Sequence, residues 1–256
     1  HQARSLHYMT NQMIHRGPDD EGFTLIRRNG EISSYRGEDT CPAPELDFEN
    51  SSYLNNPIES AYVQPSQVAL GHRRLSIVDL SPHGHQPLCT QDKKYWIVFN
   101  GEIYNHQEIA AKLKSEGVQL RSHCDTEVLI NAYARWGERC LEKFNGDFAF
   151  AIWDSIKNTL FCARDRIGIK PFYYTIQNGQ LIFASDIKTI IASELYQSEV
   201  DHEGLYFAMA FGIAPRPITA FKGIRALEQG HWMRVHVDGR IEKRKYWNVP
   251  VGTQEP

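Results

Sequence analysis

Apolar residues recur along this chain at two spacings, one typical of helices and one typical of strands. Near the N-terminus, Leu6, Met9 and Met13 fall at helical intervals, and the Gly17-Pro18 pair then interrupts the pattern. The next apolar run, FTLIRR at residues 23–28, has the length of a strand. The chain is therefore predicted to open with an amphipathic helix followed by a strand.

Two more helices are predicted in the middle of the chain. Asn105 and Glu108 form a capping-box-like pair ahead of the first, and Gly117 follows its expected end. The second is expected to begin near Asp125, to carry an apolar stripe on one face, and to end at Gly137.

Strands are predicted for most of the remaining apolar runs. The run YWIVF at residues 95–99 is typical of a buried strand. After residue 146, short runs separated by turn residues have the form of an antiparallel meander, and a last hairpin turns at Asp238-Gly239. The runs of the meander are FAFAIWD, TLFCARD, PFYYTI and QLIFAS. Because they are apolar nearly throughout and no helix separates them, we expect an α+β fold of stacked antiparallel sheets with helices outside.

Two segments lack both spacings. Residues 29–66 carry Pro, Asn, Ser and acidic residues without either period, which predicts an irregular insertion at the surface. Residues 248–256 are predicted to form a departing tail, and residues 1–247 to form one domain.

Composition narrows the class of protein further. Of 256 residues, 41% are hydrophobic and 23% charged, which suits a soluble globular domain with a sizeable core. The net charge of −3 provides no electrostatic footprint for nucleic acid, and the apolar runs are too short to span a bilayer, so neither partner is expected. The first residues lack the pattern of a secretory signal, which favours a cytoplasmic location.

The cysteines and histidines do not form a recognisable metal or nucleophile motif. Five widely spaced cysteines without a CxxC pair argue against disulfides and zinc, and Cys124 beside His123 is a poor nucleophile pair because adjacent side chains of an extended segment face opposite ways. His83 and His85 have the spacing of a metal pair but no convincing third ligand, so no metal is expected.

A polar cluster follows the buried strand at residues 95–99. Asn100-Gly101 has the composition of a hairpin turn, yet the next predicted element is a helix. Residues 100–104 are therefore interpreted as a loop that places a side-chain amide, the Gly101 N–H and the Glu102 carboxylate near one another. Two such donors can stabilise a developing oxyanion, as acyl transfer requires.

Opposite charges elsewhere have both structural and functional interpretations. Arg73 and Arg74 lie in an apolar segment, and one of two adjacent strand side chains must point inward, where an arginine needs a carboxylate from the protein or from a ligand. Asp125 is either a charge at a helix N-terminus or a carboxylate facing a ligand ammonium.

Two highly charged segments are predicted to be structural. Arg164, Asp165, Arg166 and Lys170 in RDRIGIKP are expected to form an ion network. The segment HRGPDDEG, residues 15–22, is interpreted as a hydrogen-bonded wall of a site, with its acids largely solvated.

Six motifs in order, taken together, resemble the glutamine-hydrolysing domain of asparagine synthetases, a class II glutamine amidotransferase domain. They are HRGPDDEG, GHRRLSIVDL with the downstream QPL, FNGEIYNH, DTEVL, FNGDFAFAIWD and RDRIGIKPFYY. The resemblance covers residues 1 to about 247 and implies an N-terminal-nucleophile hydrolase fold, a four-layer αββα sandwich of two antiparallel sheets between helix layers.

The same resemblance implies a mechanism and a set of site residues. In this family a cysteine at the N-terminus of the mature chain attacks the side-chain amide of glutamine, ammonia leaves, and water hydrolyses the thioester to glutamate. Asn100 and Gly101 would form the oxyanion hole. Arg74 would hold the α-carboxylate of glutamine, Asp125 and Glu102 its α-ammonium, and the backbone at Ile77 and Val78 would line the pocket.

The sequence departs from the family pattern at its start. Residue 1 is His, so the nucleophile strand is expected to lie upstream of His1. The resemblance implies no cofactor in this domain; ATP and Mg²⁺ are expected in a C-terminal synthetase domain, the implied partner beside glutamine, and a homodimer is left open. A non-catalytic scaffold, as in β-lactam synthetases, and an amidotransferase for a sugar or polymer acceptor are the alternatives.

Overall fold

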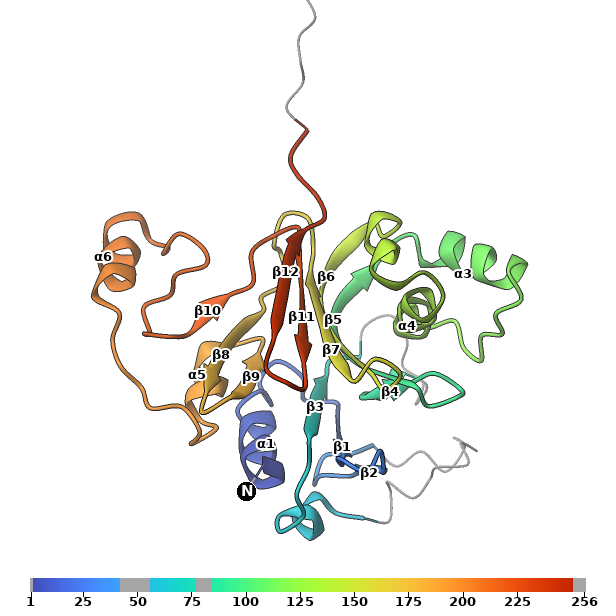
Figure 1. The fold of residues 1–256 in the computed structure, drawn as a ribbon, viewed down its shortest axis with the longest axis horizontal. Coiled ribbons are helices and arrows are strands. Elements are labelled where there is room, and N and C mark those ends of the chain that lie inside the picture. The colour runs from blue at the N-terminus through green and yellow to red at the C-terminus, as the bar shows by residue number, and fades with distance from the viewer. Residues whose placement is uncertain (1, 42–55, 77–83, 251–256) are drawn as a thin grey trace, which may run out of the picture.

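Three antiparallel sheets organise the computed structural model, which describes residues 2–41, 56–76 and 84–250 (Figure 1). The largest has the strand order β12-β11-β7-β6-β5-β4, and the two smaller sheets have the orders β2-β1-β3 and β10-β8-β9. The large sheet comprises β4 (Leu88–Cys89), β5 (Tyr95–Ile103), β6 (Gly146–Asp154), β7 (Thr159–Arg164), β11 (His231–His236) and β12 (Ile241–Lys245). The small sheets comprise β1 (Asp20–Ile26), β2 (Ile32–Tyr35) and β3 (Val68–Arg74), and β8 (Tyr173–Gln177), β9 (Gln180–Ala184) and β10 (Arg225–Ala226).

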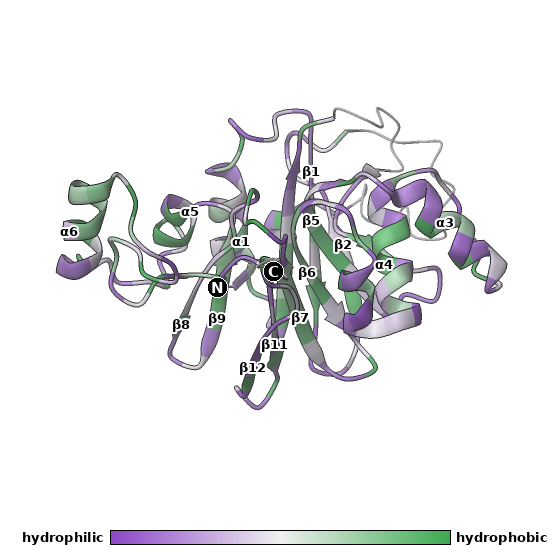
Figure 2. Ribbon diagram, turned by 90° about the horizontal axis from the view of Figure 1, so that it is seen from above, coloured by the Kyte–Doolittle hydropathy of each residue, from purple (hydrophilic) through white to green (hydrophobic). Residues whose placement is uncertain are grey.

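One face of the large sheet is closed by helices. The helices α3 (His106–Ser115) and α4 (Asp125–Trp136), with the 3₁₀ helix η3 (Gly137–Glu142), lie over β5 and β6 (Figure 1). The alternation of strand side chains directs Phe150 and Phe161 to this face, where Tyr133 of α4 stacks on Phe161 with ring centroids 4.8 Å apart. Figure 2 shows the apolar strands and the mixed hydropathy of these helices.

The other face of the large sheet packs against both small sheets. Trp96 and Val98 of β5 share a core with Leu70 of β3 and Tyr174 of β8. The outer faces of the small sheets are covered by α1 (Gln2–Asn11) and α5 (Ile187–Ile191). The layers therefore run helix, sheet, sheet, helix, and the second sheet layer consists of two three-stranded pieces.

Helix α1 bridges those two pieces. Its Ala3 packs with Phe23 of β1, whereas its Met9 packs with Ile182 of β9. Strands β3 and β9 are the edges of their sheets and line one cavity, which α1 also lines.

The predicted hairpins and central helices are confirmed, whereas the insertion at residues 29–66 is only partly irregular. β2 pairs with β1, and the 3₁₀ helix η1 (Ile58–Ala61) buries Ile58 completely, because both segments contribute apolar side chains beneath α1. Residues 42–55 of this segment lie outside the described residues.

Two other predictions need correction, and two helices were not predicted. Asn105 forms no cap bond with its side chain, which instead joins Lys143 O and Asn145 N. The meander is divided, since β6 and β7 belong to one sheet and β8 and β9 to another. Helix α5 was not predicted, and neither was α6 (His202–Phe211), which exposes Tyr206, Met209 and Phe211 to solvent.

Candidate active site

A cavity of about 1810 Å³ opens between the two sheet layers. Its lining comes from β3, β5, β9, α1 and the start of α4. Every described residue of the predicted site lines it: Arg74, Asn100, Gly101, Glu102 and Asp125. Ile77 and Val78 lie outside the described residues. Residues from three distant parts of the sequence therefore line one cavity.

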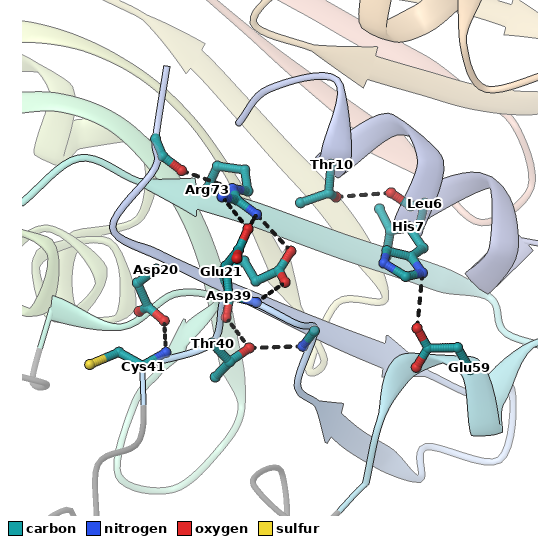
Figure 3. A network of polar contacts seen from close by, with 12 residues as sticks. Leu6, His7, Thr10, Asp20, Glu21, Asp39, Thr40, Cys41, Glu59 and Arg73 are labelled. Atoms are coloured by element: carbon teal, nitrogen blue, oxygen red, sulfur yellow. Dashed lines mark hydrogen bonds and ion pairs between the residues drawn. The ribbon is translucent and has the colours of Figure 1, made fainter. Parts of the chain in front are cut away.

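The adjacent arginines of β3 face opposite sides of their strand. Arg73 is the more deeply buried, and its guanidinium donates to Gly17 O at 2.8 Å, to Glu21 Oε2 at 3.0 Å and to Asp39 Oδ2 at 2.9 Å (Figure 3). The protein thus neutralises Arg73 with its own carboxylates. Arg74 lies on the same face as Leu70, which packs toward the large sheet, and its guanidinium rests against Gly84.

Of the segment HRGPDDEG, His15 and Arg16 line the cavity, and its acids are less solvated than predicted. Only Asp19 is exposed; Asp20 and Glu21 are 3% and 2% exposed. Glu21 is buried because it pairs with Arg73, and Asp20 because its carboxylate bonds His85 Nδ1 and Cys41 N at 2.8 and 2.9 Å (Figure 3 shows Cys41). Burial opposes ionisation of Asp20, yet the bonds from His85 and Cys41 hold its pKa below the usual range.

A second titratable group lies near the Arg74 guanidinium. His72 is two residues before Arg74 on the same face of β3 and lines the cavity. Burial lowers the pKa of His72 to about 4, and the charges of His85 and Arg74 act in the same direction against the attraction of Asp20. The ring is therefore neutral at pH 7, which leaves Arg74 as the cationic member of this pair.

Asn100 and Gly101 belong to a strand, and the predicted loop is wrong. β5 continues to Ile103 and pairs with β6 at Asn100 with Ala149 and at Gly101 with Phe148. At Gly101 φ is +151°, and a Cβ there would lie 2.1 Å from Asp147 O. Only glycine fits this approach of the two backbones. The amide of Asn100 and the backbone of Gly101 both line the cavity.

Asp125 faces the same cavity from the first turn of α4. Its Oδ2 accepts a hydrogen bond from Ile103 N at 3.1 Å, whereas the helix cap is Cys124, without a side-chain bond. Burial raises the pKa of Asp125 above its usual range, although the bond from Ile103 and the charge of His106 oppose the shift. Such a carboxylate gains from a cationic ligand. Glu102 lines the cavity as an exposed side chain.

Comparison with known proteins decides the family. The model of the glutamine amidotransferase domain family matches residues 56–247. This chain belongs to the glutamine amidotransferase domain family. Asparagine synthetase [glutamine-hydrolyzing] 3 of Bacillus subtilis (strain 168) is 41% identical over 185 residues, 71% of this chain and 30% of the relative. Asparagine synthetase [glutamine-hydrolyzing] 1 of that organism is 39% identical over 78% of this chain and 32% of the relative. The chain thus spans about a third of the length of these relatives.

The fold of the amidotransferase domain agrees with a solved structure. The glutamine phosphoribosylpyrophosphate amidotransferase of B. subtilis superposes with a TM-score of 0.67 at 16% identity, over 96% of this chain and 47% of that one. This likeness confirms the predicted sandwich fold. Within the described residues, no helix combines the length and apolar character that crossing a bilayer requires.

Four cysteines of this amidotransferase chain have raised pKa values, so they are not activated as nucleophiles. Burial raises the pKa of Cys89 to about 11, and it also raises the pKa values of Cys124, Cys140 and Cys162. Cys124 lines the cavity, but as a thiol it is a poor nucleophile. His85 of the predicted histidine pair binds Asp20, while His83 lies outside the described residues, and the described residues hold no group of three or more side chains suited to a metal.

The motif RDRIGIKP is structural, but it is not an ion network. Arg164 is completely buried and donates to the carbonyls of Gly168, Lys170 and Leu227. Asp165 is equally buried and accepts from the backbone N–H groups of residues 167–170. Each charge is thus satisfied by backbone dipoles, and together they fix the loop that carries the chain between the two sheet layers.

Proposed function

We propose that this chain is the glutaminase domain of an asparagine synthetase-like enzyme, which hydrolyses glutamine and delivers ammonia to an ATP-dependent synthetase domain. The observation that carries the proposal is the meeting of a cation, two carboxylates and an amide-bearing strand around one cavity. Free glutamine is a zwitterion with a side-chain amide, so it requires each of these groups at a fixed separation.

In the proposed complex the chain binds and orients glutamine. Arg74 pairs with the α-carboxylate, and Asp125 with Glu102 faces the α-ammonium. The Asn100 amide and the Gly101 N–H then point at the side-chain carbonyl. When a thiolate attacks that carbon, negative charge develops on the oxygen, and these two donors stabilise it. Collapse of this intermediate breaks the C–N bond, and the nitrogen takes the proton lost by the thiol and leaves as ammonia. Water then cleaves the thioester to glutamate and restores the thiol.

The nucleophile is proposed to come from a cysteine outside the residues printed here, as the family resemblance implies. The raised pKa values of the buried cysteines support this assignment, since a thiol with a raised pKa attacks slowly. The edges of β3 and β9 on the cavity leave backbone groups that an additional extended segment can pair with. ATP and Mg²⁺ are proposed to act only in the synthetase domain.

The test is glutamate release from glutamine by the intact protein. Asn100→Ala is expected to lower kcat by about 10²- to 10³-fold with little change in KM, because it removes a donor used mainly in the transition state. Asp125→Asn keeps an acceptor for Ile103 N but loses the charge, so KM is expected to rise by about 10- to 100-fold. Asp92→Asn, on the exposed β4–β5 turn, is the matched control.

Two results would contradict the proposal. An unchanged KM in Asp125→Asn would remove that carboxylate from the glutamine site. Glutamine binding without any glutamate release by the intact wild-type protein would favour the non-catalytic scaffold instead.

A further inference from the structure

The outer edge of β5 has a regular pattern of hydrogen bonds next to the proposed oxyanion site. Phe99 N donates to Gln86 Oε1 at 2.7 Å, and Ile103 N donates to Asp125 Oδ2 at 3.1 Å. Both acceptors lie on the side away from β6. Since successive residues of a strand direct their N–H groups to alternate sides, Gly101 must direct its N–H to this same outer edge.

The pairing of β5 with β6 agrees with this direction. Phe148 is the residue opposite Gly101, and its carbonyl accepts from Asp165 N at 2.7 Å, on the far side of β6. Phe148 is thus turned away from Gly101. Among the described residues, no acceptor reaches the Gly101 N–H, which lies between one N–H held by Gln86 and another held by Asp125.

Gln86 extends the pairing of β4 with β5 beyond Leu88, the first residue of β4. β4 pairs with β5 at Leu88 with Ile97, and the same register continued by two residues puts Gln86 opposite Phe99. There the side chain takes over from the backbone: Oε1 accepts from Phe99 N, and Nε2 donates to Phe99 O at 3.3 Å. Gln86 is only 6% exposed, so water cannot readily replace either bond.

The segment that carries Gln86 is itself anchored. The preceding residue, His85, bonds Asp20 of β1 at 2.8 Å, and a Cβ on Gly22 would lie 2.4 Å from Gln86 O. The segment therefore lies directly against β1 and cannot withdraw from β5 without breaking the His85 contact.

We propose that Gln86 is a positioning residue, which fixes the edge of β5 so that the Gly101 N–H points at the glutamine carbonyl. The inference rests on the proposed function, and it adds a residue to that site. An oxyanion donor is effective only when it is held in place before the reaction, because reorientation during the reaction costs free energy. Two hydrogen bonds at Phe99 hold the strand two residues before Gly101.

The experiment compares three variants of the intact protein. Gln86→Met keeps the length of the side chain and loses both bonds; Gln86→Glu keeps the acceptor for Phe99 N and loses the donor; Gln12→Met, exposed beyond α1, is the control. The readouts are kcat and KM for glutamine, inhibition by an aldehyde analogue of glutamine, and amide hydrogen exchange across β5. The aldehyde forms a tetrahedral oxyanion with a thiolate and so reports the oxyanion donors directly.

Gln86→Met is expected to lower kcat about 10- to 100-fold, to weaken the aldehyde by a similar factor, and to leave KM within about threefold. For Gln86→Glu, kcat and the affinity for the aldehyde should lie between those of Gln86→Met and wild type. Amide exchange should accelerate at residues 99–101 and stay unchanged in β6 and β7. A purely structural role would instead lower thermal stability without separating kcat from KM.

Unchanged kcat and unchanged exchange at residues 99–101 in Gln86→Met would overturn the inference. If the intact wild-type protein releases no glutamate, the proposed function fails, and the exchange at residues 99–101 still decides whether Gln86 holds this strand edge.

Discussion

Two adjacent arginines of this chain have different roles, one in the structure of the protein and one in the proposed ligand site. Arg73 and Arg74 are indistinguishable by sequence pattern, yet Arg73 is neutralised by Glu21 and Asp39, whereas Arg74 lies on the opposite face of β3 with its guanidinium against Gly84. The alternation of a strand predicts that the two differ, but it cannot say which one meets protein carboxylates. That depends on Asp39, which is 34 residues away along the chain.

Asp20 and His72, both near the site, make stability depend on pH in separate ranges. Asp20 has a lowered pKa, so its contribution is complete above the unfolded value of about 3.9 and is lost as the pH falls through the folded value. His72 has its pKa lowered to about 4, so the unfolded state binds a proton before the folded state does. The free energy of unfolding therefore falls as the pH decreases from about 6.5 to about 4.

Asp20→Asn is expected to remove the loss of stability below about pH 4 and to keep the loss between about pH 6.5 and 4. Without the charge, the free energy of unfolding at pH 7 should fall by about 1–3 kcal/mol, and less stability should be lost below pH 4. Denaturant midpoints measured from pH 3 to 7 check this, with His72→Gln as the complementary variant that should flatten the range from pH 6.5 to 4. An acid profile of Asp20→Asn identical to that of wild type would refute the role of the His85 pair.

At the scale of elements, short segments outside regular structure determine the geometry of the site. The segment Gly84–Gln86 contacts Arg74 through Gly84, β1 through His85 and β5 through Gln86. The sequence predicted the strands on either side of it, because their periodicity is local. It did not predict the importance of Gln86, whose contact with Phe99 depends on where β4 begins.

Gly84 offers a test of this arrangement. A Cβ at position 84 would lie 2.1 Å from Arg74 Nη2, the mobile end of a flexible side chain. Gly84→Ala is therefore expected to displace the guanidinium at little cost in stability, about 1 kcal/mol or less, and to raise KM for glutamine roughly tenfold with kcat preserved. Steady-state kinetics beside a thermal melt check both parts, and an unchanged KM for glutamine would contradict the displacement of Arg74.

Prediction was least successful where tertiary contacts override local composition. Asn100-Gly101 has the composition of a turn, but pairing with β6 draws it into β5. The polar segment at residues 29–66 carries β2 because β1 offers it an edge, and α6 escaped detection since its apolar residues do not face a core. The capped end of α4 at Gly137 followed the prediction, since φ of +61° there is a local property.

At the scale of the whole molecule, the two faces of the large sheet differ. The closed side is a continuous core between this sheet, α3 and α4, whereas the opposite face shares a core with the small sheets and also borders the cavity. The family resemblance implied the four layers. The division of the second sheet layer into two pieces joined by α1 was not predicted, since it depends on strand edges far apart in sequence.

This division predicts how the protein opens. Amide hydrogens of β5, β6 and β7 should exchange last, because these strands are paired and buried on the closed side, and those of β3 and β9 should exchange earlier by at least about tenfold. Mass-spectrometric hydrogen exchange on the intact protein measures both sets. Equal protection of β3 and β6 would show that the cavity does not weaken the layer beside it.

The hydrogen bonds along the outer edge of β5 also oppose aggregation by the addition of another β-strand. A foreign β-strand adds to an edge by bonding to successive N–H and C=O groups on every second residue. Along this edge, Gln86 occupies Phe99 and Asp125 occupies Ile103, so the opening at Gly101 is one residue wide. A single carbonyl can bond there, but an added β-strand would find no free N–H group two residues away in either direction.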